Sequence, residues 1–143
     1  MAVFINQTPR KVQFVGYRAD GLKFDQHDPS IYPGYARYIN RDHYGDYPIY
    51  IVVAYMSGAN VPDRLNIKQS NNNRAGAGLE YKNIFIDNLG LKLDVGMNST
   101  TYYSTGLAVT KTRFDSVWTL SEKRNKWCFK PGGKFTNKML CGW

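Results

Sequence analysis

Short runs of apolar residues, separated by Pro, Gly, Asn and Asp, recur along the whole chain. The most apolar run is Ile49–Met56, which has no polar face and therefore predicts a strand that is buried on both sides. In Leu89–Val95 every second residue is apolar, the period of a strand with one buried face. We expect this strand to pair with Tyr81–Asp87 across a turn at Asp87–Asn88.

Similar but shorter patterns predict the other strands. Asp20-Gly21 is a two-residue hairpin signal that pairs Val12–Arg18 with Leu22–Phe24. Phe114–Leu120 fits two descriptions, a strand or the start of a helix reaching about Lys126. The remaining predicted strands are Val3–Ile5, Leu65–Lys68, Thr100–Thr105, Leu107–Thr112 and Trp127–Lys130.

This spacing predicts an all-β protein, an antiparallel β-sandwich or barrel of about eight short strands with long loops and room for one short helix. No helical stretch is long enough to connect parallel neighbours, which favours antiparallel pairing. The length of 143 residues fits one domain spanning residues 1–143.

Three segments interrupt the strand pattern. Residues 24–48 form an irregular loop broken by Pro and Gly, with a helical turn expected at Tyr35–Asn40. Residues 69–78, with the sequence QSNNNRAGAG, are polar and Gly-rich, which is typical of a flexible arm that orders on a partner. Residues 121–143 are expected to form a basic hairpin around a turn at Pro131–Gly133.

Charge is distributed unevenly along the chain. The formal net charge is +8, and residues 121–143 contribute +5 of it, from six Lys and Arg against one acid. Such a basic segment fits either of two explanations. It is a solvated surface, or it contacts an anionic partner, which would be nucleic acid or an acidic protein face.

Neither a secretory leader nor a membrane-length apolar run is recognisable, so we expect a virion or cytoplasmic location and no membrane partner. Cys128 and Cys141 are then reduced thiols, although a bridge between them stays open. Nothing in the sequence calls for a cofactor. It contains no GxSxG turn, and its Gly-rich stretches do not link a strand to a helix as phosphate-binding loops do.

The long loop is the main candidate for function, because it concentrates tyrosine and arginine. These residue types dominate the energetics of protein interfaces. The alternative is a loop that packs on itself and closes one end of the sandwich. The candidate interface residues are Tyr32, Tyr35, Arg37, Tyr38, Arg41, Tyr44 and Tyr47.

A second candidate is the basic C-terminal segment, where cations alternate with aromatic rings. In single-strand nucleic-acid grooves rings stack on bases and cations hold phosphates. The same alternation fits a hairpin whose rings enter the core while its lysines face water, and the sequence favours this simpler interpretation. The candidate nucleic-acid-binding residues are Lys123, Arg124, Lys126, Trp127, Phe129, Lys130 and Lys134.

A third and weaker candidate is a metal or acid–base site in the long loop. Both histidines of the chain lie there beside aspartates, and the set Asp25, His27, Asp42 and His43 would suit a divalent metal. Asp and His are also common turn residues, and their spacing here matches no metal motif.

The sequence therefore ranks three functions. The first is a non-enzymatic structural subunit of a large symmetric assembly, such as a capsid-decorating or head–tail protein of a virion, which contacts other protein subunits through its aromatic loop. The second is a single-stranded nucleic-acid-binding β-barrel that uses the C-terminal segment. The third is a metal-dependent hydrolase built on the Asp/His loop.

Overall fold

The computed structural model describes residues 2–24, 29–39, 50–69, 84–86, 89, 91–93, 101–104, 106–113 and 115–139. Within these ranges almost all regular structure is β-strand. The strands are β1 (Ala2–Gln7), β2 (Val12–Arg18), β3 (Ala36–Ile39), β4 (Tyr50–Met56), β5 (Ile67–Gln69), β6 (Ile84–Ile86), β7 (Leu91–Leu93), β8 (Thr101–Ser104), β9 (Leu107–Thr112), β10 (Val117–Lys123) and β11 (Lys126–Pro131).

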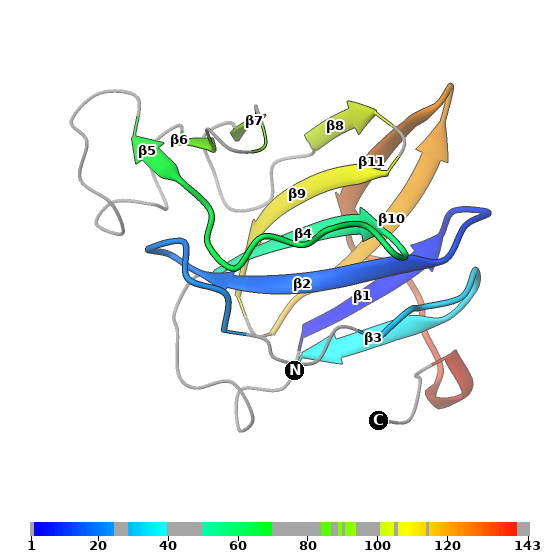
Figure 1. Cartoon of the computed structure of the whole chain (residues 1–143). Coiled ribbons are helices and arrows are strands. Elements are labelled where there is room, and N and C mark those ends of the chain that lie inside the picture. Colours follow the sequence, from blue (N-terminus) through cyan, green and yellow to red (C-terminus); the bar gives the residue numbers. More distant parts are fainter. Residues whose placement is uncertain are drawn as a thin grey trace.

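The strands form two main sheets that pack face to face (Figure 1). One sheet has five strands in the order β3-β1-β10-β11-β8, and the other has three in the order β2-β4-β9. A third, small sheet of β5-β6-β7 packs against the outer face of the β2-β4-β9 sheet. The predicted all-β sandwich is confirmed, and the barrel that the sequence left as the alternative is not formed.

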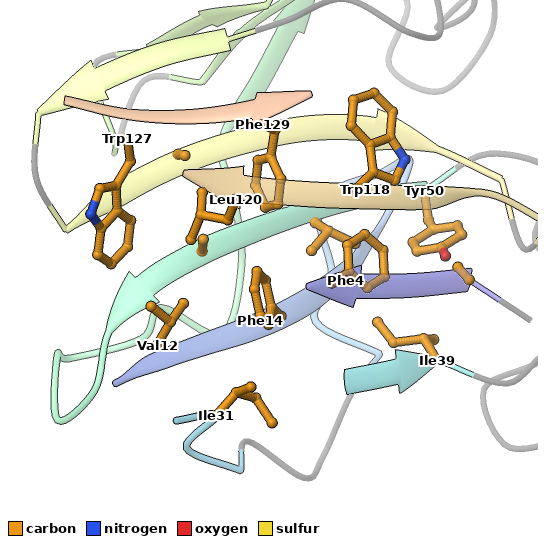
Figure 2. Packing of buried hydrophobic residues seen from close by; sticks show 14 residues of the cluster. Phe4, Val12, Phe14, Ile31, Ile39, Tyr50, Trp118, Leu120, Trp127 and Phe129 are labelled. Carbon is orange, nitrogen blue, oxygen red and sulfur yellow. The ribbon is translucent and has the colours of Figure 1, made fainter. Parts of the chain in front are cut away.

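The central core lies between the two main sheets and is rich in large rings (Figure 2). Phe129 on β11 meets Trp118 on β10 edge to face, with ring centroids 6.2 Å apart. The ring centroid of Phe14, on the opposite sheet, lies 6.0 Å from that of Phe129. The Trp118 indole donates its N–H to Thr112 Oγ1 over 2.7 Å, so this buried polar group is satisfied.

Strand β4 confirms the prediction for Ile49–Met56, a strand buried on both sides. Val52 and Ala54 point into the central core between the main sheets. Ile51 and Val53 point the other way, into a second cluster that Ile86 of the small sheet helps to cover. Both faces are apolar because both faces are covered.

The pairing of β6 with β7 is also as predicted, with Ile84 opposite Leu93 and Ile86 opposite Leu91. One pairing differs from the all-antiparallel expectation. Strands β1 and β10 are parallel, with Val3 opposite Val117 and Gln7 opposite Ser121. No helical crossover is needed, because the chain between these two strands builds most of the sandwich before it returns.

The helical turn expected at Tyr35–Asn40 was wrong. Residues Ala36–Ile39 form β3, which pairs antiparallel with β1. The ambiguous stretch Phe114–Leu120 resolves as a strand from Val117 onward. The turn at Asp20-Gly21 is formed, but the expected strand Leu22–Phe24 is reduced to isolated bridges to Tyr17 and Arg64.

The C-terminal hairpin lies earlier than expected. Its strands are β10 and β11, and its turn is Arg124–Asn125, with φ angles of 55° and 62°. Between Gly132 and Met139, where the description ends, the chain forms no return strand and crosses the outer face of the five-stranded sheet. Phe135 and Met139 pack there on Val3, Ile5 and Ala36, and a 3₁₀ turn at Asn137–Met139 ends the described chain.

Candidate interaction site

Asn6, near the end of β1, organises the end of the sandwich at which β1 leads into β2. Its fully buried side-chain amide donates to the carbonyl oxygens of Arg10 and Ile31, over 2.7 and 2.8 Å. Its Oδ1 accepts from the backbone N–H and the hydroxyl of Thr8, over 3.0 and 2.7 Å. One satisfied side chain thereby holds together the turn after β1 and the segment before β3.

A tight turn at Tyr32–Tyr35, here called the tyrosine turn, is fixed to this end. The Tyr35 N–H donates to the Tyr32 carbonyl over 3.0 Å, and Gly34 has a φ of +85°. Pro at the second position and Gly with positive φ at the third are the signature of a type II turn. The Gly34 N–H donates to the Asn6 carbonyl and the Asn6 N–H to the Tyr35 carbonyl, each over 2.8 Å, so the turn is anchored to β1.

The two tyrosines of this turn point outward. Tyr32 is 56% exposed and Tyr35 is 45% exposed. They are two of the three exposed large apolar side chains in the described ranges, the third being Leu22. The Lys11 ammonium lies 5.2 Å from the centre of the Tyr32 ring, within cation–π distance. The tyrosine turn is therefore a rigid, exposed aromatic surface with a cation on its edge.

The tip of the β10–β11 hairpin is tied to the same end through Glu122. Its carboxylate accepts from Arg10 Nε and from Trp127 Nε1, each over 2.9 Å. These bonds, first from Arg10 and then from Trp127, lower the pKa of the Glu122 carboxyl below its usual range. The carboxylate stays ionised at neutral pH and links the turn after β1 to the hairpin.

The predicted interface set is only partly at the surface. Tyr32 and Tyr35 are exposed, while Tyr38 is half-buried against the outer cluster on Val3 and Ile5. Arg37 is fully buried and donates from Nη1 to the carbonyl of Phe14 on β2. It connects the edges of the two main sheets from inside the sandwich. Arg41, Tyr44 and Tyr47 lie outside the described residues.

The predicted nucleic-acid set divides cleanly by side-chain type. Trp127 and Phe129 are fully buried in the central core, where no base reaches them without unfolding (Figure 2). The cations are exposed: Lys123, Arg124, Lys126, Lys130 and Lys134. The hairpin with its rings inside and its lysines outside, the simpler of the two sequence-based interpretations, is what the structure shows.

The candidate metal residues Asp25, His27, Asp42 and His43 lie outside the described residues, as does most of the arm at 69–78. Among the residues that are described, no three His, Cys, Asp or Glu side chains gather as a metal site would require. Cys128 is a buried free thiol, and its possible partner Cys141 is also outside the described ranges.

The Tyr50 phenol is a titratable group inside the core, and its surroundings show whether it could exchange a proton with a substrate. Tyr50 is fully buried, and its hydroxyl donates to the Arg113 carbonyl over 3.4 Å. Burial, reinforced by Asp115, raises the pKa of the Tyr50 phenol far above its usual range, although Arg37 acts in the opposite direction. The phenol is thus neutral and closed off from water, which suits packing and not proton transfer to a substrate.

Sequence reasoning missed Arg10 and Lys11 as parts of the candidate site. Nothing in the local sequence around Thr8-Pro9-Arg10 indicates what lies beside it. Their neighbours Tyr32 and Glu122 are 21 and 112 positions away in the chain. Only the pairing of β1 with β10 and the anchoring of the tyrosine turn bring these groups together.

Within the described parts of the chain, no helix is long and apolar enough to cross a membrane. Comparison with known proteins identifies no relative: no family model matches the chain, and neither the curated proteins nor the solved structures contain a match.

Proposed function

We propose that the protein is a non-enzymatic structural subunit of a larger assembly, which attaches to a neighbouring protein subunit through the tyrosine turn. A virion component of the capsid-decorating or head–tail type fits this role. The observation that carries the proposal is the exposure of Tyr32 and Tyr35 on a turn whose backbone is fixed to β1 by two hydrogen bonds. A third bond, from the Asn6 side chain, holds the Ile31 carbonyl immediately before the turn.

Rigidity and residue type both support contact as the role of this turn. Tyrosine buries a large area on binding at low entropic cost, because its side chain has few rotatable bonds. Its hydroxyl can form a hydrogen bond to water or to a partner. A turn that is already ordered adds little further entropy loss on association. Lys11 beside the Tyr32 ring favours a partner face that carries carboxylates.

The experiment compares tyrosine accessibility in two states of the protein. Nitration with tetranitromethane followed by peptide mass spectrometry is applied to the purified chain and to the assembly isolated from its native source. Tyr32 and Tyr35 should react in the purified chain and be protected at least several-fold in the assembly. Tyr17 and Tyr55 are buried and hydrogen-bonded to each other over 3.0 Å, so they should stay unreactive in both.

A matched pair of variants separates contact from folding. Y32A/Y35A should abolish incorporation into the assembly while L22A, an exposed apolar residue in a different loop, should incorporate normally. If the chain in its native source sediments as a monomer, and both tyrosines are as reactive there as in the purified chain, the proposal is wrong.

A further inference from the structure

The exposed side of the β10–β11 hairpin, here called the lysine face, is chemically different from the tyrosine turn. Trp127 and Phe129 point into the core, so Lys126 and Lys130, which flank them, point outward, whereas Cys128 between them is buried. On β10 the same alternation places Lys123 outward, beyond Trp118 and Leu120. Arg124 adds a further exposed cation in the turn.

The register concentrates these charges. Lys123 lies directly opposite Lys126, and like charges in that position repel each other. Arg124 stands at the tip with a φ of 55°, a left-handed conformation that side chains other than Gly and Asn adopt rarely. A bound anion would offset the repulsion between the two lysines.

Lys134 and Lys138 extend the same side of the sheet. Both are exposed on the segment that crosses the outer face, where Phe135 and Met139 pack on Val3 and Ile5. The acidic residues of the described ranges lie elsewhere. Asp20, Asp63 and Asp115 are in loops away from the hairpin tip, and the Glu122 carboxylate is engaged with Arg10 and Trp127.

We propose that the lysine face binds the phosphate backbone of nucleic acid without recognising its sequence. Protein interfaces are depleted in lysine and need an apolar or aromatic centre, which this face lacks in its described residues. Phosphate contacts need only cations at suitable spacing. Lys126 and Lys130 are four residues apart on one strand, about 13 Å, which corresponds to about four base-pair steps along the axis of a duplex.

This inference goes beyond the tyrosine turn and does not depend on it. It also differs from a single-strand groove of the stacking type, because the two rings of the hairpin are unavailable to bases. Single strands and duplexes offer the same phosphate chemistry, so both are probes in the experiment.

The test is fluorescence anisotropy of the full chain with a labelled 30-nucleotide single strand and a labelled 20-base-pair duplex, across a series of NaCl concentrations. The wild type should bind both at low salt, with affinity that falls steeply as salt rises. K123Q/K126Q/K130Q should reduce the magnitude of the slope of log affinity against log salt by about 2–3, since each of the three lost phosphate contacts contributes about 0.7–0.9. K23Q/R64Q/R113Q removes the same charge away from the hairpin and should change the slope by less than half as much.

Three results would overturn the inference. The first is no binding at low salt, and the second is an equal loss in the two triple variants, which would mean unspecific attraction to the whole charge. The third is equal or tighter binding of a labelled polyglutamate, which would identify an acidic protein as the partner.

Y32A/Y35A should bind the oligonucleotides as the wild type does, so failure of this inference and failure of the proposed assembly role remain distinguishable. Equal thermal midpoints of all variants establish that they are folded.

Discussion

Arg10 and Glu122, which are 112 positions apart in the sequence, are joined by an ion pair of 2.9 Å between Nε and Oε1. The Glu122 side chain is only 13% exposed, whereas that of Arg10 is 44% exposed. The same oxygen also accepts the indole N–H of the buried Trp127. This pair therefore joins the surface of the candidate site to the core beneath it.

Replacement of Glu122 should reveal which of its two bonds matters. E122A leaves the Trp127 N–H without an acceptor and should lower the free energy of unfolding by about 1–3 kcal/mol. E122Q keeps an acceptor oxygen and loses only a partly exposed ion pair, so it should cost less than about 1 kcal/mol. Urea denaturation monitored by tryptophan fluorescence measures both. Equal losses in the two variants would show that the ion pair, and not the indole bond, is the important contact.

The same carboxylate predicts a pH dependence of stability. Folding lowers the pKa of Glu122, so between its folded and unfolded pKa values the unfolded chain binds more protons. The stabilisation is therefore complete above about pH 5 and is lost as the pH falls through the lowered pKa. The stability difference between wild type and E122Q, measured from pH 7 down to pH 3, should shrink over that range. A difference that stays constant to pH 3 would contradict the assignment.

Local patterns in the sequence were sufficient for the strands whose own residues determine their environment. Ile49–Met56 is apolar on both faces and became β4 with both faces covered. Trp127 and Phe129 alternate with lysine, and this period correctly predicts rings inside and cations outside. In both cases the period of two reports burial directly.

The errors arose where a distant segment decides the local structure. A helical turn was expected at Tyr35–Asn40, but backbone pairing with β1 makes Ala36–Ile39 a strand. Nor does any local signal show that the last described segment covers the sheet instead of returning as a strand. The candidate site shares this origin, since its tyrosine and basic parts meet only through the pairing of the first and tenth strands.

Two glycines with similar backbone angles should respond differently to alanine. Gly34 has a φ of +85° and open space where a Cβ would stand, so G34A should cost only the left-handed conformation, about 1 kcal/mol. Gly21 has a φ of +96°, and a Cβ there would lie 2.1 Å from the Leu65 carbonyl oxygen. G21A must also displace that backbone, whose Leu65 N–H donates to the Gly21 carbonyl over 2.8 Å.

We therefore expect G21A to lose at least about 2 kcal/mol more than G34A in chemical denaturation. The two variants control for each other, because both place a methyl group at a positive φ. Similar losses would mean that the Asp20-Gly21 turn adjusts freely and does not fix the neighbouring segment at Leu65.

Arg37 is the most consequential of the residues that the sequence assigned to a surface. Its guanidinium is fully buried and donates to the Phe14 carbonyl on the edge of the opposite sheet. R37A removes a large buried side chain and the donor to that carbonyl together, and should lower the free energy of unfolding by about 3–5 kcal/mol. R37K retains a cation and one donor but not the planar fork, so its loss of stability should be intermediate.

R10A is the control. The Arg10 side chain is partly exposed, so its removal should lower the free energy of unfolding by about 1 kcal/mol or less. If R37A is as stable as R10A, Arg37 does not hold the two sheet edges together.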